Sequence, residues 1–238
     1  MRLDDPEIVR REYATEDGLR ARASVYDAVA GPDAREVAFA AVADVAPAQV
    51  LEVGCGWGAF AARVADELGA AVTAIDLSPR MVELARERGV HARVGDVQDL
   101  PFAASSFDVA VANWMLYHVR DLDRGISELA RVLRPGGRLV AATNAIDHLG
   151  ELWTLVGRDR RREPLRFFSE TGEAALRLHF ASVERREIVG TVTFRDRHAV
   201  RGYVASSIAH KHLADRVPEL SAPLVATRRN TIFVAEKT

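Results

Sequence analysis

The chain has 238 residues, 48% hydrophobic and 28% charged, a composition typical of a globular protein and not of a disordered or collagen-like one. Its 32 Lys and Arg against 34 Asp and Glu give a formal charge of −2, so we expect no nucleic-acid partner and no membrane partner. The single cysteine, Cys55, excludes a disulfide framework and a multi-thiolate metal site, and the acidic start of the chain argues against a secretory signal and for a cytoplasmic protein.

The first 47 residues are predicted to form a helical cap. Apolar side chains recur at spacings of three to six residues from Glu12 to Ala30, which predicts one helix. The Gly31-Pro32-Asp33 segment breaks this helix and opens a second one, which runs to about Val45 and is ended by Pro47.

Short apolar runs alternate with amphipathic segments over residues 48–143. This alternation predicts βαβ units and a parallel sheet that helices cover on both faces. The predicted strands are Val50–Val53, Ala71–Ile75, Val90–Val94, Phe107–Ala112 and, after a Pro135-Gly136-Gly137 turn, Arg138–Thr143. The predicted helices are Trp57–Leu68, Ser78–Arg88 and Leu122–Leu133.

The pattern is looser over residues 144–238. Helices are predicted over Ala145–Arg158, from Ser169 to near Phe180 and from about His198 to Leu213, and strands over Ser182–Val189 and Asn230–Ala235. The basic run 158–162 predicts an exposed loop. Because no repeat or linker interrupts the chain, we expect one domain over residues 1–238, made of the cap, the core 48–143 and the final segment 144–238.

A glycine-rich loop, Gly54-Cys55-Gly56-Trp57-Gly58, follows the first strand of the predicted core and opens a helix. Glycines at alternate positions remove side chains where the backbone turns sharply and a ligand approaches closely. Their spacing differs from that of the dinucleotide fingerprint. Glu52 precedes the first glycine by two residues, where an acid suits the cationic end of a ligand better than a pyrophosphate. The alternative interpretation is that the three glycines serve only helix–strand packing.

Three more polar residues follow the next predicted strands. Asp76 is placed to accept hydrogen bonds from both hydroxyls of a ribose. Asp96 is placed to accept one from an exocyclic adenine amine, or else it starts the next turn through a bond to its own backbone. Asn113 lies at the crevice outside the carboxyl ends of the strands, where ligands of such sheets bind. With Glu52, these residues are predicted to line one edge of the sheet.

Four segments together resemble a known family. Residues 51–58 (LEVGCGWG), 75–81 (IDLSPRM), 95–102 (GDVQDLPF) and 133–137 (LRPGG) are similar to class I S-adenosylmethionine-dependent methyltransferases, in particular the small-molecule group called UbiE or type 11. The resemblance covers roughly residues 48–143. It implies an α/β, Rossmann-like doubly wound sheet of seven strands, the last antiparallel, with helices on both faces and the amino-terminal cap over the cofactor.

The resemblance also implies S-adenosyl-L-methionine as the cofactor. Glu52 and the glycine loop would surround its methionine part, with Asp76 on the ribose, Asp96 and Val97 at the adenine, and Asn113 near the methionine part or the methyl. The predicted cofactor-binding residues are Glu52, Gly54, Cys55, Gly56, Gly58, Asp76, Leu77, Met81, Asp96, Val97 and Asn113. Cys55 is expected to fill space, because nothing basic flanks it to activate the thiol. No cluster of metal ligands is present in the sequence, so no metal is expected.

The predicted reaction is in-line transfer of the methyl group to an oxygen or nitrogen of a small-molecule acceptor. His118, after the fourth core strand, is the candidate general base, or else an ordinary half-buried histidine. Tyr13 and Tyr26 in the cap are candidate acceptor-binding residues or core aromatics. His148 either binds the acceptor together with His118 or lies on a helix surface. The resemblance also implies that the pocket for the acceptor lies in the segment from about Ala145 to Leu213.

Two other functions stay open at this point. A nicotinamide-dependent oxidoreductase shares the βαβ frame and the acid at position 76, although the glycine spacing and Asp96 count against it. A non-catalytic, methyltransferase-like binding module would keep every binding residue without turnover. The sequence leaves open the identity of the acceptor, the use of a base, and whether the protein is a monomer or a homodimer.

Overall fold

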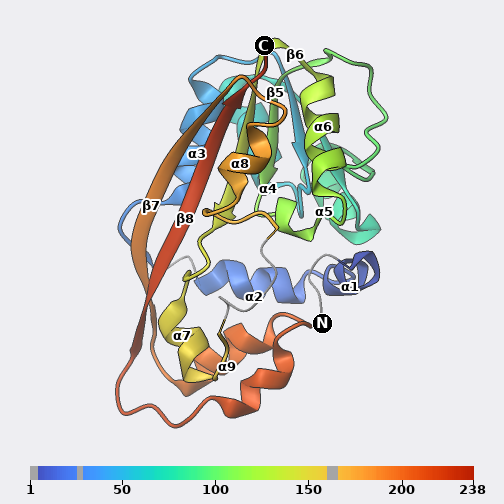
Figure 1. The fold of residues 1–238 in the computed structure, drawn as a ribbon. Coiled ribbons are helices and arrows are strands. Elements are labelled where there is room, and N and C mark those ends of the chain that lie inside the picture. Colours follow the sequence, from blue (N-terminus) through green and yellow to red (C-terminus); the bar gives the residue numbers. More distant parts are fainter. Residues whose placement is uncertain (1–4, 26–28, 160–165) are drawn as a thin grey trace.

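A computed structural model describes residues 5–25, 29–159 and 166–238 (Figure 1). Its described strands form a single sheet with the order β1-β7-β8-β6-β5-β2-β3-β4. The strands are β1 (Val29–Ala30), β2 (Gln49–Val53), β3 (Ala71–Asp76), β4 (His91–Val94), β5 (Phe107–Asn113), β6 (Leu133–Asn144), β7 (Ser182–Phe194) and β8 (Leu224–Glu236).

The strand directions agree with the predicted doubly wound sheet. Neighbours from β4 across to β6 are parallel, and β8 is antiparallel to both β6 and β7. The antiparallel last strand is therefore confirmed. The prediction of seven strands is wrong by one, because β1 adds a two-residue antiparallel pair at the edge, Val29 with Val192 and Ala30 with Thr191. Two residues give too little pattern to be recognised from sequence.

Helices cover both faces of the sheet, as predicted. On one face, α3 (Ala34–Ala43), α4 (Ala59–Leu68) and α5 (Pro79–Glu87) pack against alternate strand residues such as Val50, Ala74 and Val111. On the other, α6 (Leu122–Val132) and α8 (Gly172–Leu176) pack against Leu51, Ala112 and Phe233. The short helix η2 (Leu116–His118) follows β5. Consecutive strand residues point to opposite faces, so both cores come from the same strands.

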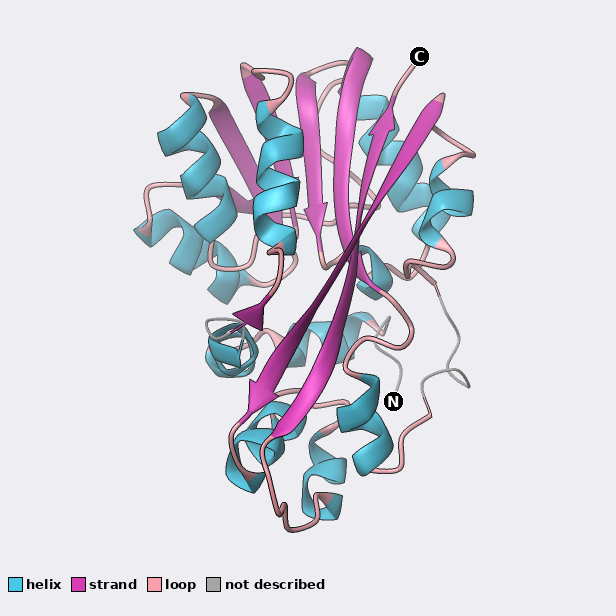
Figure 2. Ribbon diagram, turned by 90° about the vertical axis from the view of Figure 1, so that its left-hand side faces the viewer, coloured by secondary structure: helices cyan, strands magenta, loops and turns pink. Residues whose placement is uncertain are grey.

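The ends of β7 and β8 continue beyond the rest of the sheet and carry a further small core (Figure 2). Around them lie α7 (Gly150–Leu155), α9 (Arg197–Ala205) and η4 (Lys211–Arg216). Leu152, Phe194 and Val200 are among the buried residues of this core. We call these helices, with the strand ends, the C-terminal unit.

The amino-terminal cap differs from the prediction. The helix expected over 12–30 is wrong: α1 (Pro6–Glu12) ends before Tyr13, and α2 (Asp17–Val25) begins after a break. Asp5 caps α1 by accepting the Glu7 N–H, so helix starts earlier than the apolar pattern suggests. Figure 1 shows α2 lying across the lower end of the sheet, above α7 and α9.

Several element boundaries after residue 132 also differ. The Pro135–Gly137 turn lies inside β6 as an irregularity, where the pairing jumps from Phe107–Leu133 to Val109–Arg138. The helix expected over 145–158 is only α7, because residues 146–149 form a turn in which Leu149 has φ 56°. The other two predicted helices are shortened to α8 and α9, and both final strands are longer than expected. Within the described residues, no helix is long and apolar enough to cross a membrane.

Candidate functional site

The sheet register brings three of the predicted polar residues to one face. Glu52 pairs with Ala74 on β3 and with Val111 on β5, and paired residues of neighbouring strands point to the same face. Asp76 and Asn113 each lie two residues further along those strands, so they share that face. All three stand at the carboxyl ends of parallel strands, where ligands of open α/β sheets bind.

Glu52 is a buried carboxyl with one unpaired oxygen. Its side chain is 3% exposed, and Oε2 has no hydrogen-bond partner. Burial raises the pKa of Glu52 to about 8, the Asp76 charge acts in the same direction, and the Ala61 N–H opposes them. A cation beside such a group would stabilise its anionic form, so this position suits a positively charged ligand group.

Asp76 is held in place by the backbone of the loops around it. Oδ2 accepts the Gly56 N–H at 2.9 Å, and Oδ1 accepts the Ser78 N–H at 2.9 Å. Burial raises the pKa of this carboxyl, although these N–H groups act in the opposite direction. The Leu77 N–H acts on this carboxylate in the same way as those of Ser78 and Gly56. A carboxylate can accept about four hydrogen bonds, so Asp76 keeps some accepting capacity for a ligand hydroxyl.

Asn113 presents an unused amide. Both Nδ2 and Oδ1 are buried, and neither has a partner. Buried polar groups are nearly always hydrogen-bonded, so two orphaned atoms on one side chain make Asn113 a candidate ligand-binding residue. The next residue, Trp114, has φ 52°, an outlier for a bulky side chain. Its indole N–H donates to Asn144 Oδ1 at 3.1 Å, a bond that fixes the ring on this strained backbone.

The three loop glycines all have left-handed backbone, with φ of 64°, 53° and 77° at Gly54, Gly56 and Gly58. A Cβ on Gly58 would lie 2.8 Å from Ala85 Cβ, so this glycine serves the packing of α4 against α5. On Gly56 a Cβ would lie 3.3 Å from Leu19 Cδ2 in the cap. The packing interpretation therefore holds for Gly58, and the cap lies directly on the loop at Gly56.

The remaining predicted cofactor residues divide into buried and half-buried positions. Met81, Val97 and Cys55 are buried, with exposures of 0%, 5% and 7%, and Leu77 is half-buried. Burial raises the pKa of the Cys55 thiol, and the Glu52 and Asp76 charges add to this effect, which keeps it protonated.

Asp96 makes the local turn considered as its alternative. Its Oδ1 accepts the Gln98 backbone N–H at 2.9 Å, and the Gln98 amide bonds both of its carboxylate oxygens. It lies two residues beyond the end of β4, half-buried, with these bonds using part of its accepting capacity. A role of Asp96 at an adenine stays a prediction.

Tyr13 and His118 meet although 105 positions separate them in the chain. The Tyr13 hydroxyl lies 3.1 Å from His118 Nε2, and the rings are edge to face with centroids 5.7 Å apart. The Tyr117 ring also packs against His118, with the two ring centroids 4.5 Å apart. Burial raises the pKa of Tyr13, although Arg22 lowers it, so Tyr13 stays a neutral hydroxyl.

The other acceptor candidates are placed differently. His148 is 2% exposed in a turn, not on a helix surface, and its Nδ1 lies 2.9 Å from the Arg229 carbonyl oxygen. This contact fastens the turn to β8; binding of an acceptor by His148 stays a prediction. Tyr26 and the arginines at 160–162 lie outside the described residues.

Two residues that the sequence analysis missed also lie at the site. Leu19 covers Gly56, and Met115 lies against Gly54, where a Cβ would be 2.7 Å from Met115 Cβ. Met115 lies two residues after Asn113, so its position could have been noticed. Leu19 gave no signal beyond its place in an amphipathic stripe.

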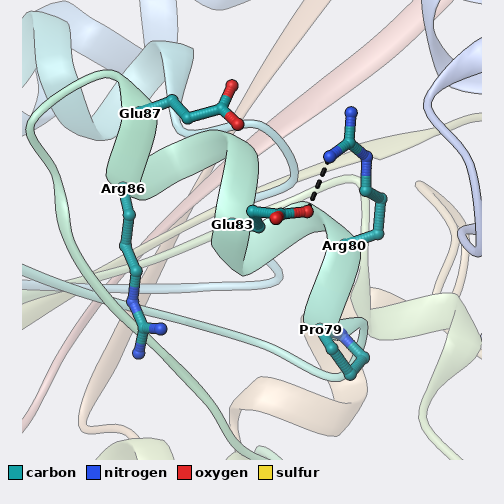
Figure 3. Close-up of a pocket in the computed structure, with 5 residues that line it drawn as sticks. All are labelled: Pro79, Arg80, Glu83, Arg86 and Glu87. Carbon is teal, nitrogen blue, oxygen red and sulfur yellow. Dashed lines mark hydrogen bonds and ion pairs between the residues drawn. The ribbon is translucent and has the colours of Figure 1, made fainter.

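A surface hollow lies elsewhere, on the outer face of α5 (Figure 3). It is lined by Pro79, Arg80, Glu83, Arg86 and Glu87, and Arg80 pairs with Glu83 across it at 2.6 Å. None of the predicted site residues lines this hollow. Across the described part of the chain, no group of three or more His, Cys, Asp or Glu side chains is arranged to hold a metal ion.

Comparison with known proteins explains the geometry of this edge. Residues 51–141 match the family model of the methyltransferase domain. This part of the chain is a methyltransferase domain. It contains Glu52, the glycine loop, Asp76, Asp96 and Asn113.

Relatives support the same assignment. The chain is 41% identical over 115 residues to the O-methyltransferase cnsE of Penicillium expansum, a match that covers 44% of this chain and 42% of that protein. It is 44% identical over 107 residues to the ubiquinone biosynthesis O-methyltransferase of Xanthomonas oryzae pv. oryzae, covering 42% and 44%. The methyltransferase domain thus matches these relatives over less than half of their length.

Likeness of fold extends over nearly the whole chain. The structure of phosphoethanolamine N-methyltransferase 2 from Haemonchus contortus, in complex with phosphomonomethylethanolamine and S-adenosylhomocysteine, superposes with a TM-score of 0.61. It covers 94% of this chain and 58% of that one at 20% identity. At this identity the likeness shows the shared Rossmann-like fold.

Proposed function

We propose that the protein transfers a methyl group from S-adenosyl-L-methionine to a hydroxyl oxygen of a small-molecule acceptor. The observation that carries the proposal is the group of orphaned buried atoms, Glu52 Oε2 and both polar atoms of Asn113, beside Asp76 on one face of the methyltransferase domain. Their chemistry fits this cofactor better than it fits a dinucleotide.

The fit can be stated group by group. Glu52 would hold the ammonium of the methionine part, whose positive charge balances its buried carboxylate. Asp76, whose carboxylate keeps accepting capacity beside its backbone partners, would hold the ribose hydroxyls. Asn113 can both donate and accept, which suits the zwitterionic methionine end. When bound, the cofactor supplies a methyl group on a positively charged sulfur.

The protein's own contribution is orientation and proton transfer. Holding the acceptor oxygen in line with the methyl is worth about 7–11 kcal/mol of the barrier. His118, the last residue of η2 and next to Tyr13, would accept the hydroxyl proton of the acceptor on a ring nitrogen, an effect of about 10²–10⁴-fold. Oxygen is favoured over nitrogen because both relatives described above are O-methyltransferases.

Calorimetric titration with S-adenosylhomocysteine tests the cofactor, with NAD titrated in parallel. We expect micromolar binding of the first and none of the second. Asp76→Asn should weaken binding by about 10²-fold, because each lost charge-assisted hydrogen bond is worth about 1.5–3 kcal/mol. Asp66→Asn, an exposed carboxylate on α4, is the matched control and should bind as the wild type does.

The alternatives give different results in the same experiment. Binding of NAD without S-adenosylhomocysteine would establish the oxidoreductase and overturn the proposal. Binding of S-adenosylhomocysteine, with no methyl transfer from S-adenosylmethionine to any hydroxylated acceptor in a broad screen, would favour the non-catalytic module.

A further inference from the structure

A buried ion pair joins the cap to the C-terminal unit, and the chemistry described above does not use it. Arg22 Nη1 lies 2.6 Å from Glu12 Oε1, and the Glu12 side chain is only 5% exposed. The other oxygen of Glu12 accepts the Ile208 backbone N–H at 2.7 Å and the Ser207 hydroxyl at 3.3 Å. Arg22 Nη1 also donates to the Ser206 carbonyl at 2.7 Å.

Each partner of this ion pair therefore contacts the same turn, residues 206–208, directly after α9. A carboxylate and a guanidinium lose their hydration on burial, and only close pairing with further hydrogen bonds compensates that loss. The cap also lies too close to the turn for any larger residue at position 18, since a Cβ on Gly18 would overlap the Ser206 carbonyl oxygen. The docking is thus specific to this arrangement.

The ion pair surrounds the residue that reaches His118. Glu12 is the last residue of α1 and Tyr13 directly follows it. The Arg22 guanidinium carbon lies 5.8 Å from the centre of the Tyr13 ring. On the other side, the Tyr13 carbonyl accepts the Ser78 hydroxyl at 2.7 Å, which ties the cap to the start of α5. Tyr13 is therefore held between the C-terminal unit and the methyltransferase domain.

We propose that Glu12 and Arg22 are positioning residues, which hold the Tyr13 hydroxyl on His118 by docking the cap onto residues 206–208. This proposal rests on the proposed function, in which His118 is the base. It makes closure of the cap and assembly of the Tyr13–His118 pair a single event. A substitution at Glu12 then changes the surroundings of His118 through Tyr13.

The test reads the His118 ring directly and needs no acceptor. Protein with ¹⁵N-labelled histidine is examined by NMR with and without S-adenosylhomocysteine, and His118 is assigned among the seven histidines by His118→Gln. Tyr13→Phe defines the Nε2 shift that accompanies loss of the hydroxyl. We expect Glu12→Gln and Arg22→Gln to change the Nε2 chemical shift of His118 in the same direction and by the same amount as Tyr13→Phe does. Adding Glu12→Gln to Tyr13→Phe should produce no further shift.

Matched controls and a conservative variant separate positioning from general damage. Glu7→Gln on α1 and Arg20→Gln on α2 remove exposed charges of the cap and should leave His118 unchanged. Arg22→Lys keeps the cation and should bring the Nε2 chemical shift closer to the wild-type value than Arg22→Gln does. This comparison still tests the proposal if Glu12→Gln unfolds. A wild-type Nε2 shift in Glu12→Gln or Arg22→Gln, or additive shifts in the double variant, would overturn the proposal. If the wild-type protein does not bind S-adenosylhomocysteine, the proposed function is refuted, while the ligand-free spectra still test the positioning.

Discussion

Glu52 gives the protein a pH dependence that can be worked out from its burial. In the folded state its pKa is raised to about 8, mainly by burial, from a usual value of 4.5. A carboxyl with a raised folded pKa favours folding while it is protonated in both states, and this contribution is lost as pH rises from 4.5 to about 8. Each pH unit in that window costs about 1.4 kcal/mol of the free energy of unfolding.

The expected effect is large enough to measure. Between about pH 6 and about pH 8 the ligand-free protein should lose about 2 kcal/mol of unfolding free energy through Glu52, because the slope falls off near the folded pKa, and this lowers Tm by about 4–8 °C for a chain of this size. Glu52→Gln carries no charge at either pH, so this part of the loss should disappear. Urea denaturation of both proteins at the two pH values measures the difference, with the exposed Glu87→Gln on α5 as the control.

The same carboxyl should also report ligand binding. The ammonium of S-adenosylhomocysteine favours the ionised form of Glu52, so binding near pH 7 should release a proton. Calorimetry in two buffers of different ionisation enthalpy counts that proton, and Glu52→Gln should release none.

The stability experiment has a clear refuting outcome. If wild type and Glu52→Gln lose equal stability from about pH 6 to about pH 8, the argued charge state of Glu52 is wrong.

Three other predictions follow from the site. Gly58→Ala should lower the unfolding free energy by about 2–5 kcal/mol, since backbone strain adds to a clash with Ala85. The control is Gly69→Ala at the other end of α4, where the new Cβ meets nothing within 4 Å and should cost about 1–2 kcal/mol. Equal losses in urea denaturation would show that the clash is relieved. Asn113→Leu should stabilise the ligand-free protein by about 1–3 kcal/mol, because it removes two unpaired buried polar atoms. The same variant should bind S-adenosylhomocysteine at least about tenfold more weakly in calorimetry, and unchanged affinity would remove Asn113 from the cofactor site. His118→Gln should lower turnover of an identified acceptor by about 10²–10⁴-fold with unchanged affinity for S-adenosylhomocysteine, and full turnover would exclude it as the base.

The sequence determined the core of the fold and which polar residues stand at the carboxyl ends of its parallel strands. Alternating strands and helices over residues 48–143 were predicted correctly, because buried parallel strands and amphipathic helices leave their own periodicity in the sequence. Glu52, Asp76 and Asn113 could be placed at one edge for the same reason: each directly follows or ends a strand, and parallel strands bring their carboxyl ends together.

Only the tertiary structure decided how the cap closes over that edge. The helix expected over 12–30 breaks after Glu12, where the Glu12 carboxylate bonds to Ile208 and the Tyr13 carbonyl bonds to Ser78, so long-range contacts override local helix propensity. The contact of Tyr13 with His118 crosses 105 positions, and no local pattern records such a pairing. The raised pKa of Glu52 likewise depends on how completely the fold excludes water from it. Residue order along the chain determines which groups reach the edge, whereas long-range packing determines their contacts and their charges.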